Sequence, residues 1–167
     1  MEIFGVPSQA FFGQLLLGLI NGSFYAVLSL GLAIIFGLLN IINFAHGAQY
    51  MLGAFAAWMG LNWLGINYWA ALVLAPLAVG LLAVVIERTM LRHLYKLDHL
   101  YGLLLTFGLA LVAEGVFKNF FGVSGESYEA PEILQGGVNL GFMYLPIYRA
   151  WVVVAALTVC AAAWYVI

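Results

Sequence analysis

The chain has 167 residues, of which 66% are hydrophobic and 7% are charged, and its mean hydropathy is +1.09. A water-soluble domain needs a polar surface, so this composition excludes one and predicts an integral membrane protein with the lipid bilayer around it. The net charge is −2, and the five basic residues form no patch dense enough to follow a phosphate backbone. We therefore expect no nucleic-acid partner.

Five apolar segments are candidates for membrane-spanning helices, because a helix needs about 20 residues to cross about 30 Å of hydrocarbon. These segments cover residues 11–39, 44–61, 69–86, 100–121 and 145–167. The sequence therefore predicts an all-α, polytopic membrane protein in which residues 1–167 form a single transmembrane domain.

The first segment is longer than one crossing requires, so we expect it to tilt, to break near Asn21, or to begin as an interfacial helix. Small residues recur along it every three or four positions, which places them on one slowly drifting face of a helix. In lipid, small side chains let helix backbones approach closely. The predicted helix-packing face consists of Gly18, Gly22, Ala26, Ser29, Ala33 and Gly37.

The two long connections differ in charge. Residues 87–99 carry Arg88, Arg92 and Lys96, which indicates the cytoplasmic side. Residues 122–144 contain three glutamates and no lysine or arginine, which indicates the outer side, although Lys118 and Arg149 lie on either side of this connection. Threading back from these connections predicts an external amino terminus.

Residues 40–53 contain the only dense cluster of hydrogen-bonding side chains inside a long apolar region. Polar groups in lipid usually face protein or a cavity. The cluster can therefore form hydrogen bonds between helices, or it can line a translocation path or the hinge between two broken helices. One helical face would carry the polar residues and two small residues that allow close packing: Asn43, His46, Gln49 and Tyr50, with Gly53 and Ala57.

We predict that the chain breaks at residues 43–47, because the apolar run from residue 11 to residue 60 is too long for one crossing. Asn43 is a good helix N-cap, whose side-chain oxygen accepts from amides two or three residues further on. Gly47 would let the backbone turn or another helix approach, and His46 could hydrogen-bond a carbonyl that the break leaves free.

Glu114 is the one carboxylate inside a predicted span, and Lys118 follows four residues later, the favourable order for an ion pair on a helix. This spacing favours a structural pair that reaches toward the outer interface over a substrate or proton site. No catalytic motif occurs in the sequence. His46 has no second ligand at metal-binding spacing, so we expect no metal and no cofactor.

Four ordered motifs strongly resemble the amino-terminal signature of the branched-chain amino-acid permease family of ABC importers. The likeness continues more weakly through Glu87-Arg88 and the pattern at residues 104–111, and it covers most of the chain up to residue 121. The four motifs are Gly22-Ser23-Phe24-Tyr25-Ala26, Leu30-Gly31-Leu32-Ala33-Ile34-Ile35-Phe36-Gly37, Ile42-Asn43-Phe44-Ala45-His46-Gly47 and Tyr50-Met51-Leu52-Gly53-Ala54.

The resemblance implies a permease subunit of an ATP-driven importer in a bacterial inner membrane. Its implied partners are a homologous permease subunit, two cytoplasmic ATPase subunits and an extracytoplasmic solute-binding protein that delivers leucine, isoleucine or valine. Similar relatives carry urea, short amides or other small solutes. The family's coupling loop would follow a span like residues 145–167, so we expect this chain to be the amino-terminal portion of a longer permease.

Two alternatives belong to other classes. An intramembrane enzyme would use His46 and Glu114, and its side chains would have to meet. A structural helical partner would bury the face from Asn43 to Tyr50 against protein with no path beside it. We expect the importer subunit, in which partner ATPases drive alternating access and this chain hydrolyses no ATP.

Overall fold

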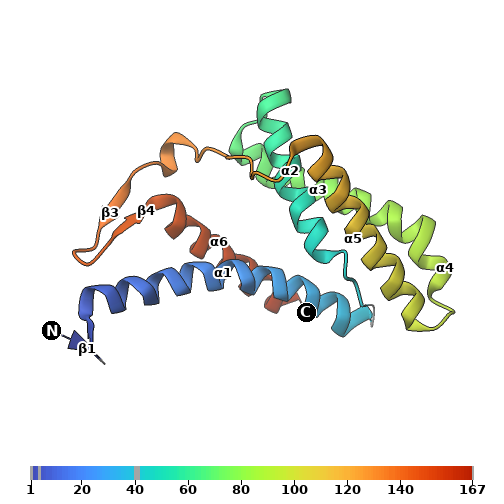
Figure 1. The fold of residues 1–167 in the computed structure, drawn as a ribbon, viewed down its shortest axis with the longest axis horizontal. Coiled ribbons are helices and arrows are strands. Elements are labelled where there is room, and N and C mark those ends of the chain that lie inside the picture. Colours follow the sequence, from blue (N-terminus) through green and yellow to red (C-terminus); the bar gives the residue numbers. More distant parts are fainter. Residues whose placement is uncertain (1, 4, 40–41, 167) are drawn as a thin grey trace. The chain divides into compact units, whose positions relative to one another are not determined.

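The computed structural model describes residues 2–3, 5–39 and 42–166 of the chain (Figure 1). Helices dominate, and two short antiparallel hairpins, β1–β2 and β3–β4, are additions that the sequence analysis did not predict. The elements in chain order are β1 (Glu2–Ile3), β2 (Val6–Pro7), α1 (Ser8–Leu39), α2 (His46–Leu64), α3 (Tyr68–Ile86), the π-helical η1 (Glu87–Leu91), α4 (Arg92–Leu94), α5 (His99–Phe121), the 3-10 helix η2 (Glu132–Leu134), β3 (Gly137–Asn139), β4 (Tyr144–Pro146) and α6 (Ile147–Val166).

Within the described ranges, four helical stretches are long and apolar enough to cross a membrane: Ser8–Gly37, Tyr68–Leu94, His99–Phe121 and Ile147–Val166. The sequence predicted five spans. The predicted span that is missing from these four is residues 44–61, which corresponds to α2. This helix has 19 residues, but His46, Gln49 and Asn62 make it less apolar than the others. Large apolar side chains are exposed along all of these helices, as expected for surfaces that meet lipid or other helices.

Helix α1 runs without interruption through Asn21, which excludes the break near that residue. Its 32 residues extend about 48 Å at about 1.5 Å per residue, which exceeds the thickness of the hydrocarbon core. Ser23 is buried, and its hydroxyl donates to the carbonyl of Ile20 at 2.7 Å. This polar group is therefore satisfied inside its own helix, so it does not interrupt α1.

The connection predicted at residues 87–99 is shorter in the structure, because the helix continues through η1 and α4 to Leu94. No glycine or proline occurs between Glu87 and Leu94 to end it. Tyr95 then donates its hydroxyl to Glu87 Oε1 at 3.1 Å. Burial first, and then the hydrogen bond and charge of Glu87, raise the pKa of Tyr95, so the phenol stays protonated and remains a donor.

We predict that residues 88–98 face the cytoplasm, since the basic residues Arg88 and Arg92 lie at this end of the helix. The test places single cysteines at Arg92→Cys and Glu129→Cys after removing the only native cysteine by Cys160→Ser. A membrane-impermeant maleimide applied to intact cells should label the second variant and not the first. Permeabilised cells, in which both should react, are the control. Labelling of intact cells at position 92 alone would show that the predicted orientation is wrong.

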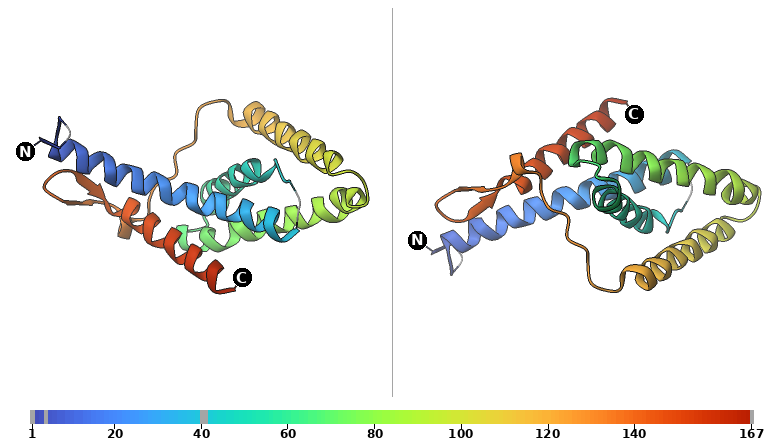
Figure 2. Two further views of the ribbon diagram at one scale, coloured as in Figure 1. Left: turned by 90° about the horizontal axis from the view of Figure 1, so that it is seen from below. Right: turned by 90° about the horizontal axis from the view of Figure 1, so that it is seen from above.

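The chain forms two compact units, Met1–Gly31 with Ala130–Ile167, and Leu32–Glu129, so α1 contributes to both. In the first unit, β3 and β4 pair antiparallel and the hairpin leads directly into α6 (Figure 2). A side chain at Gly137 would meet the ring of Tyr144 within 2.6 Å, so the hairpin requires glycine there. The N–H of Ile147 donates to the carbonyl of Gly136 at 3.1 Å, which joins the start of α6 to the hairpin.

In the second unit, α2 packs against α3 and against α5. Gly65 ends α2 with a φ of 66°, a left-handed conformation that favours glycine. Asn67 then caps α3, because its side-chain oxygen accepts from the N–H of Ala70 at 2.8 Å. Phe55 on α2 packs against Phe117 and Phe121 on α5, with ring centroids 4.5 Å and 4.8 Å apart. These aromatic contacts hold the middle of α2 beside the carboxyl-terminal end of α5.

Candidate functional site

The polar stretch, residues 40–53, begins between the end of α1 and the start of α2 and continues into α2. Helix α1 ends at Leu39 and α2 begins at His46, while residues 40–41 of the stretch lie outside the described residues. The side-chain oxygen of Asn43 accepts from the N–H of Ala45 at 2.9 Å, so Asn43 stabilises the turn that precedes α2. The expectation that Asn43 is the N-cap is wrong, because the N-cap is Ala45 and Asn43 hydrogen-bonds one step earlier, within the turn.

Thr106 on α5 holds this turn from a second element. Its side chain is 1% exposed, and its hydroxyl oxygen accepts from the N–H of Phe44 at 3.2 Å. The same hydroxyl lies 3.1 Å from the carbonyl of Leu103 and 3.4 Å from that of Ile42, either of which can accept its proton. The ring of Phe44 also packs edge-on against Phe107, with centroids 6.3 Å apart. Backbone groups that no helix satisfies are thus bound by α5.

Thr106 was not among the site residues predicted from the sequence. A signal was present, because a hydroxyl inside the apolar segment at residues 100–121 needs a hydrogen-bond partner. Its partners in the turn, Phe44 and Ile42, lie more than 60 residues earlier in the chain. No local pattern could therefore have named them.

The other predicted polar residues are only partly brought together. Asn43 donates a weak hydrogen bond to the side chain of Gln49, with 3.5 Å between nitrogen and oxygen. His46 is half-buried at the start of α2, and its N–H donates to the carbonyl of Asn43 at 3.4 Å. Tyr50 is 59% exposed. The structure therefore groups Asn43, Gln49 and the backbone of His46, and leaves the Tyr50 ring outside this group.

One of the expectations about small residues needs correction. Gly47 does not provide the turn, because it lies inside α2, and a Cβ there would meet nothing within 4 Å. All six small residues of the predicted packing face of α1 are exposed in the described chain, so close packing of this face stays a prediction. Gly53 and Ala57 on α2 are half-buried, and a Cβ on Gly53 would lie 3.9 Å from Val79 on α3.

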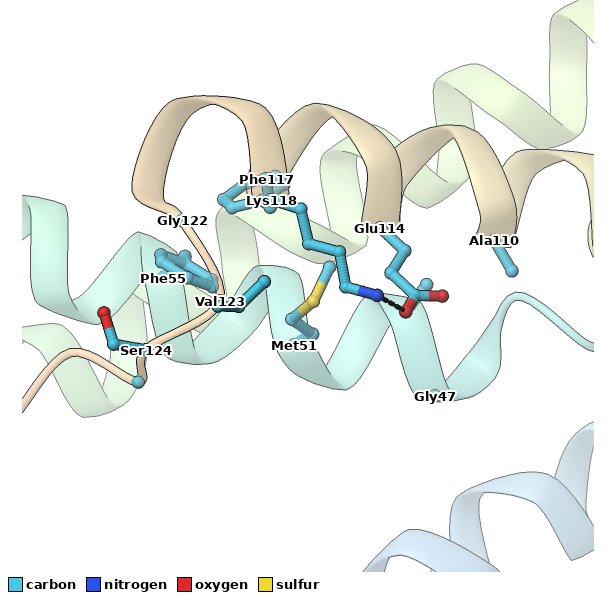
Figure 3. A pocket seen from close by; sticks show the side chains of 12 residues that line it. Gly47, Met51, Phe55, Ala110, Glu114, Phe117, Lys118, Gly122, Val123 and Ser124 are labelled. Carbon is cyan, nitrogen blue, oxygen red and sulfur yellow. Dashed lines mark hydrogen bonds and ion pairs between the residues drawn. The ribbon is translucent and has the colours of Figure 1, made fainter.

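A cavity of about 400 Å³ lies between α2, α5 and the segment that follows α5 (Figure 3). Its volume is in the range of about 300–1,000 Å³ that is usual for small-molecule sites. Its walls are mostly apolar. The lining residues are Gly47, Ala48, Met51 and Phe55 from α2, Ala110, Glu114, Phe117 and Lys118 from α5, and Gly122, Val123, Ser124 and Gly125 beyond it.

Glu114 and Lys118 form an ion pair in this cavity. Lys118 Nζ lies 2.6 Å from Glu114 Oε1, and Figure 3 shows both side chains directed into the space between α5 and α2. The side chain of Lys118 is 57% exposed and that of Glu114 is 51% exposed, so the pair can be reached from outside the chain. The four-residue spacing indicated the pair, but it gave no sign of a cavity beside it. Among the described residues, no cluster of three His, Cys, Asp or Glu could hold a metal ion.

Gly122 shapes the cavity, because it turns the chain after α5 so that Val123 and Ser124 form a wall. Its φ of 78° and ψ of −164° belong to a region that only glycine adopts readily. Gly122→Ala should therefore lower the stability of the chain by about 1–3 kcal/mol. Thermal unfolding in detergent measures this effect. The matched control is Gly125→Ala, whose backbone lacks a positive φ and whose added Cβ would meet nothing within 4 Å. Equal stability of the two variants would contradict the argument.

Taken together, the fold and the site define a polytopic helical membrane protein with a broken helix pair and a lined cavity beside it. Residues 14–167 match the family described as branched-chain amino acid transport system / permease component. The chain therefore belongs to this family, as the motifs in its first half indicated.

Curated proteins with similar sequences carry the same description. The chain is 30% identical over 138 residues to the high-affinity branched-chain amino acid transport system permease protein BraD of Pseudomonas aeruginosa. This match covers 77% of the chain and 44% of BraD. It is 39% identical over 49 residues to the permease protein LivH of Escherichia coli K12 and to LivH of Salmonella typhimurium, covering 29% of this chain and 16% of LivH. The chain spans less than half the length of these relatives, and no solved structure matches it.

Proposed function

We propose that the chain serves as the membrane-spanning permease subunit of an ATP-driven importer for branched-chain amino acids in a bacterial inner membrane. The observation that carries this proposal is the family match over residues 14–167. It is supported by the printed names of BraD and LivH, both of which are permease proteins of high-affinity branched-chain amino acid transport. Hydrolysis of ATP belongs to the partner subunits in this proposal, and this chain contributes the path.

The proposed mechanism is alternating access. The break between α1 and α2 lets the two helices move as separate bodies about residues 42–45. Thr106 joins this break to α5, and α5 also carries Glu114 and Lys118 in the cavity. A displacement of α5 would therefore act on the break and on the cavity together.

The proposed partners fit different parts of the chain. The uncovered small-residue face of α1 suits close packing against helices of a homologous permease subunit. Residues 88–98, with their basic side chains, would lie on the side of the two cytoplasmic ATPase subunits. Residues 122–144, with three glutamates, would lie on the side of the extracytoplasmic solute-binding protein.

The two alternatives from other classes are less well supported. An intramembrane enzyme needs His46 beside Glu114, but Glu114 is paired with Lys118, and His46 is not among the residues that line its cavity. A purely structural helical partner would have no path beside the Asn43 to Tyr50 face. The cavity, however, reaches Gly47 and Ala48 within that stretch.

The test of the proposed function is uptake of radiolabelled solutes by cells in which the natural gene is deleted or restored. Deletion should abolish high-affinity uptake of leucine, isoleucine and valine, and restoring the gene with its partner subunits should recover it. Uptake of urea or acetamide, measured in the same cells, should not change. Loss of urea or amide uptake alone would assign the chain to those solutes, and unchanged leucine uptake would contradict the proposal.

A further inference from the structure

We propose that Glu114 and Lys118 form a substrate site for the zwitterionic head of an aliphatic amino acid. Glu114 would bind the α-ammonium group, Lys118 would bind the α-carboxylate, and the amino-acid side chain would lie against the apolar wall of the cavity. This inference rests on the proposed function and deepens it, because it assigns residues to recognition of the substrate.

The charges in the cavity complement this ligand. The walls contain one carboxylate and one ammonium group, 2.6 Å apart, among residues that are otherwise uncharged. An α-amino acid carries an ammonium group and a carboxylate group on one carbon atom, and these charges complement those of Glu114 and Lys118. It can therefore face both side chains and leave no charge unbalanced. A ligand with a single charge could bind only one of the two side chains and would bring a charge that nothing in this mostly apolar cavity balances, which is costly.

The existing ion pair has capacity for such a ligand. An ammonium group has three N–H donors and a carboxylate has two oxygens, and the Nζ–Oε1 hydrogen bond uses one of each. Both side chains are more than half exposed. Glu114 and Lys118 can therefore bind the ligand head without first separating from each other, so neither charge has to lose its partner.

The apolar wall distinguishes an aliphatic amino acid from other zwitterions. Met51 and Phe55 on α2, Phe117 on α5 and Val123 beyond it line the same cavity, and Figure 3 shows these residues on the Lys118 side of the ion pair. A branched aliphatic side chain gains by leaving water for this wall, whereas a charged side chain would have to be desolvated without a partner. Urea and short amides carry no charges for the ion pair to bind. The cavity therefore favours leucine-like substrates within the family.

Binding can be measured without transport by a cysteine at the rim of the cavity. Ser124→Cys in a Cys160→Ser background, in the natural transporter, should be alkylated several-fold more slowly when L-leucine is present. The matched control is Val138→Cys, which is exposed on β3 and is not among the residues that line the cavity, and which leucine should not protect. 4-Methylpentanoate, which lacks the ammonium group, should not protect Ser124→Cys. No protection by leucine at concentrations that saturate uptake would overturn the proposal.

Uptake by charge variants separates this site from a purely structural ion pair. Glu114→Gln and Lys118→Gln should each reduce leucine uptake about tenfold or more at equal membrane abundance, because each removes a charge-assisted hydrogen bond to the substrate. The exchanged pair Glu114→Lys with Lys118→Glu restores an ion pair on the helix but reverses it relative to the apolar wall. We expect uptake by the exchanged pair to stay low. Recovery to the native rate, or single variants within twofold of it, would show that the pair is structural only.

The proposed function and the proposed substrate site can be refuted separately. If the unmodified transporter does not take up leucine, isoleucine or valine, the proposed function is wrong, and the site falls with it. If the unmodified transporter takes up leucine and the Gln variants do so equally well, only the site assignment is wrong. Membrane abundance and assembly with the partner subunits, measured for every variant, keep a folding defect from being taken for loss of the site.

Discussion

Replacing Thr106 with Val is expected to destabilise the assembled protein and to reduce uptake strongly. Val has nearly the same shape, so packing is kept, but the N–H of Phe44 loses its acceptor in a place where the side chain at position 106 is 1% exposed. A buried backbone donor without a partner costs about 1–3 kcal/mol. Water cannot take over the role inside a membrane, so we expect the upper part of that range. Thermal unfolding in detergent and leucine uptake at equal abundance measure the two effects.

Two controls isolate the hydroxyl of Thr106. Thr106→Ser keeps the acceptor and should retain most of the stability. Thr158→Val removes a hydroxyl from α6 that donates only to Val154, one turn earlier in the same helix, and should have little effect. If Thr106→Val unfolds at the native temperature while Thr106→Ser is destabilised, the loss comes from packing, and the link between α5 and the break is not what holds the turn.

Asn43→Leu is expected to impair assembly and uptake through the same turn. Leucine removes the acceptor for the N–H of Ala45, which is 2.9 Å from the Asn43 oxygen, and also the weaker contact to Gln49. The loss of a capping or interhelical hydrogen bond is worth about 1–2 kcal/mol. We expect His46→Leu to act in the same direction. The readouts are the fraction of chain recovered with its partner subunits and the initial rate of leucine uptake.

The control for this prediction is Leu52→Ile, a change of shape without a change of polarity within α2. Asn43→Asp adds a second comparison, because Asp keeps the acceptor for Ala45 and loses the donor to Gln49. We expect Asn43→Asp to assemble better than Asn43→Leu. Native assembly of Asn43→Leu, or a defect in Leu52→Ile of equal size, would contradict the role assigned to the turn.

The sequence by itself determined the class of the protein and the family. A span needs only a long apolar run, and such runs at residues 69–86, 100–121 and 145–167 place helices close to α3, α5 and α6. Lys118 lies four residues after Glu114, so helical geometry alone places the two side chains together. The polar stretch placed Asn43 at the break before α2, although its side-chain oxygen accepts within the turn and not as the N-cap. Each of these features depends on residues that are neighbours in the chain.

The tertiary structure alone decided which distant groups meet. Thr106 accepts from Phe44, 62 residues earlier, and this contact exists only because α5 lies beside the turn before α2. The cavity around Glu114 and Lys118 likewise needs α2 on one side and the turn at Gly122 on the other. Apolar side chains are distributed nearly evenly around these helices, so their pattern did not indicate which faces pack. The small residues of α1 indicate a packing face, but they do not name the helix that packs there, and in the described chain they are exposed. In lipid, helix pairing is decided by shape and by a few polar contacts, and a local pattern does not name the partner helix that supplies them.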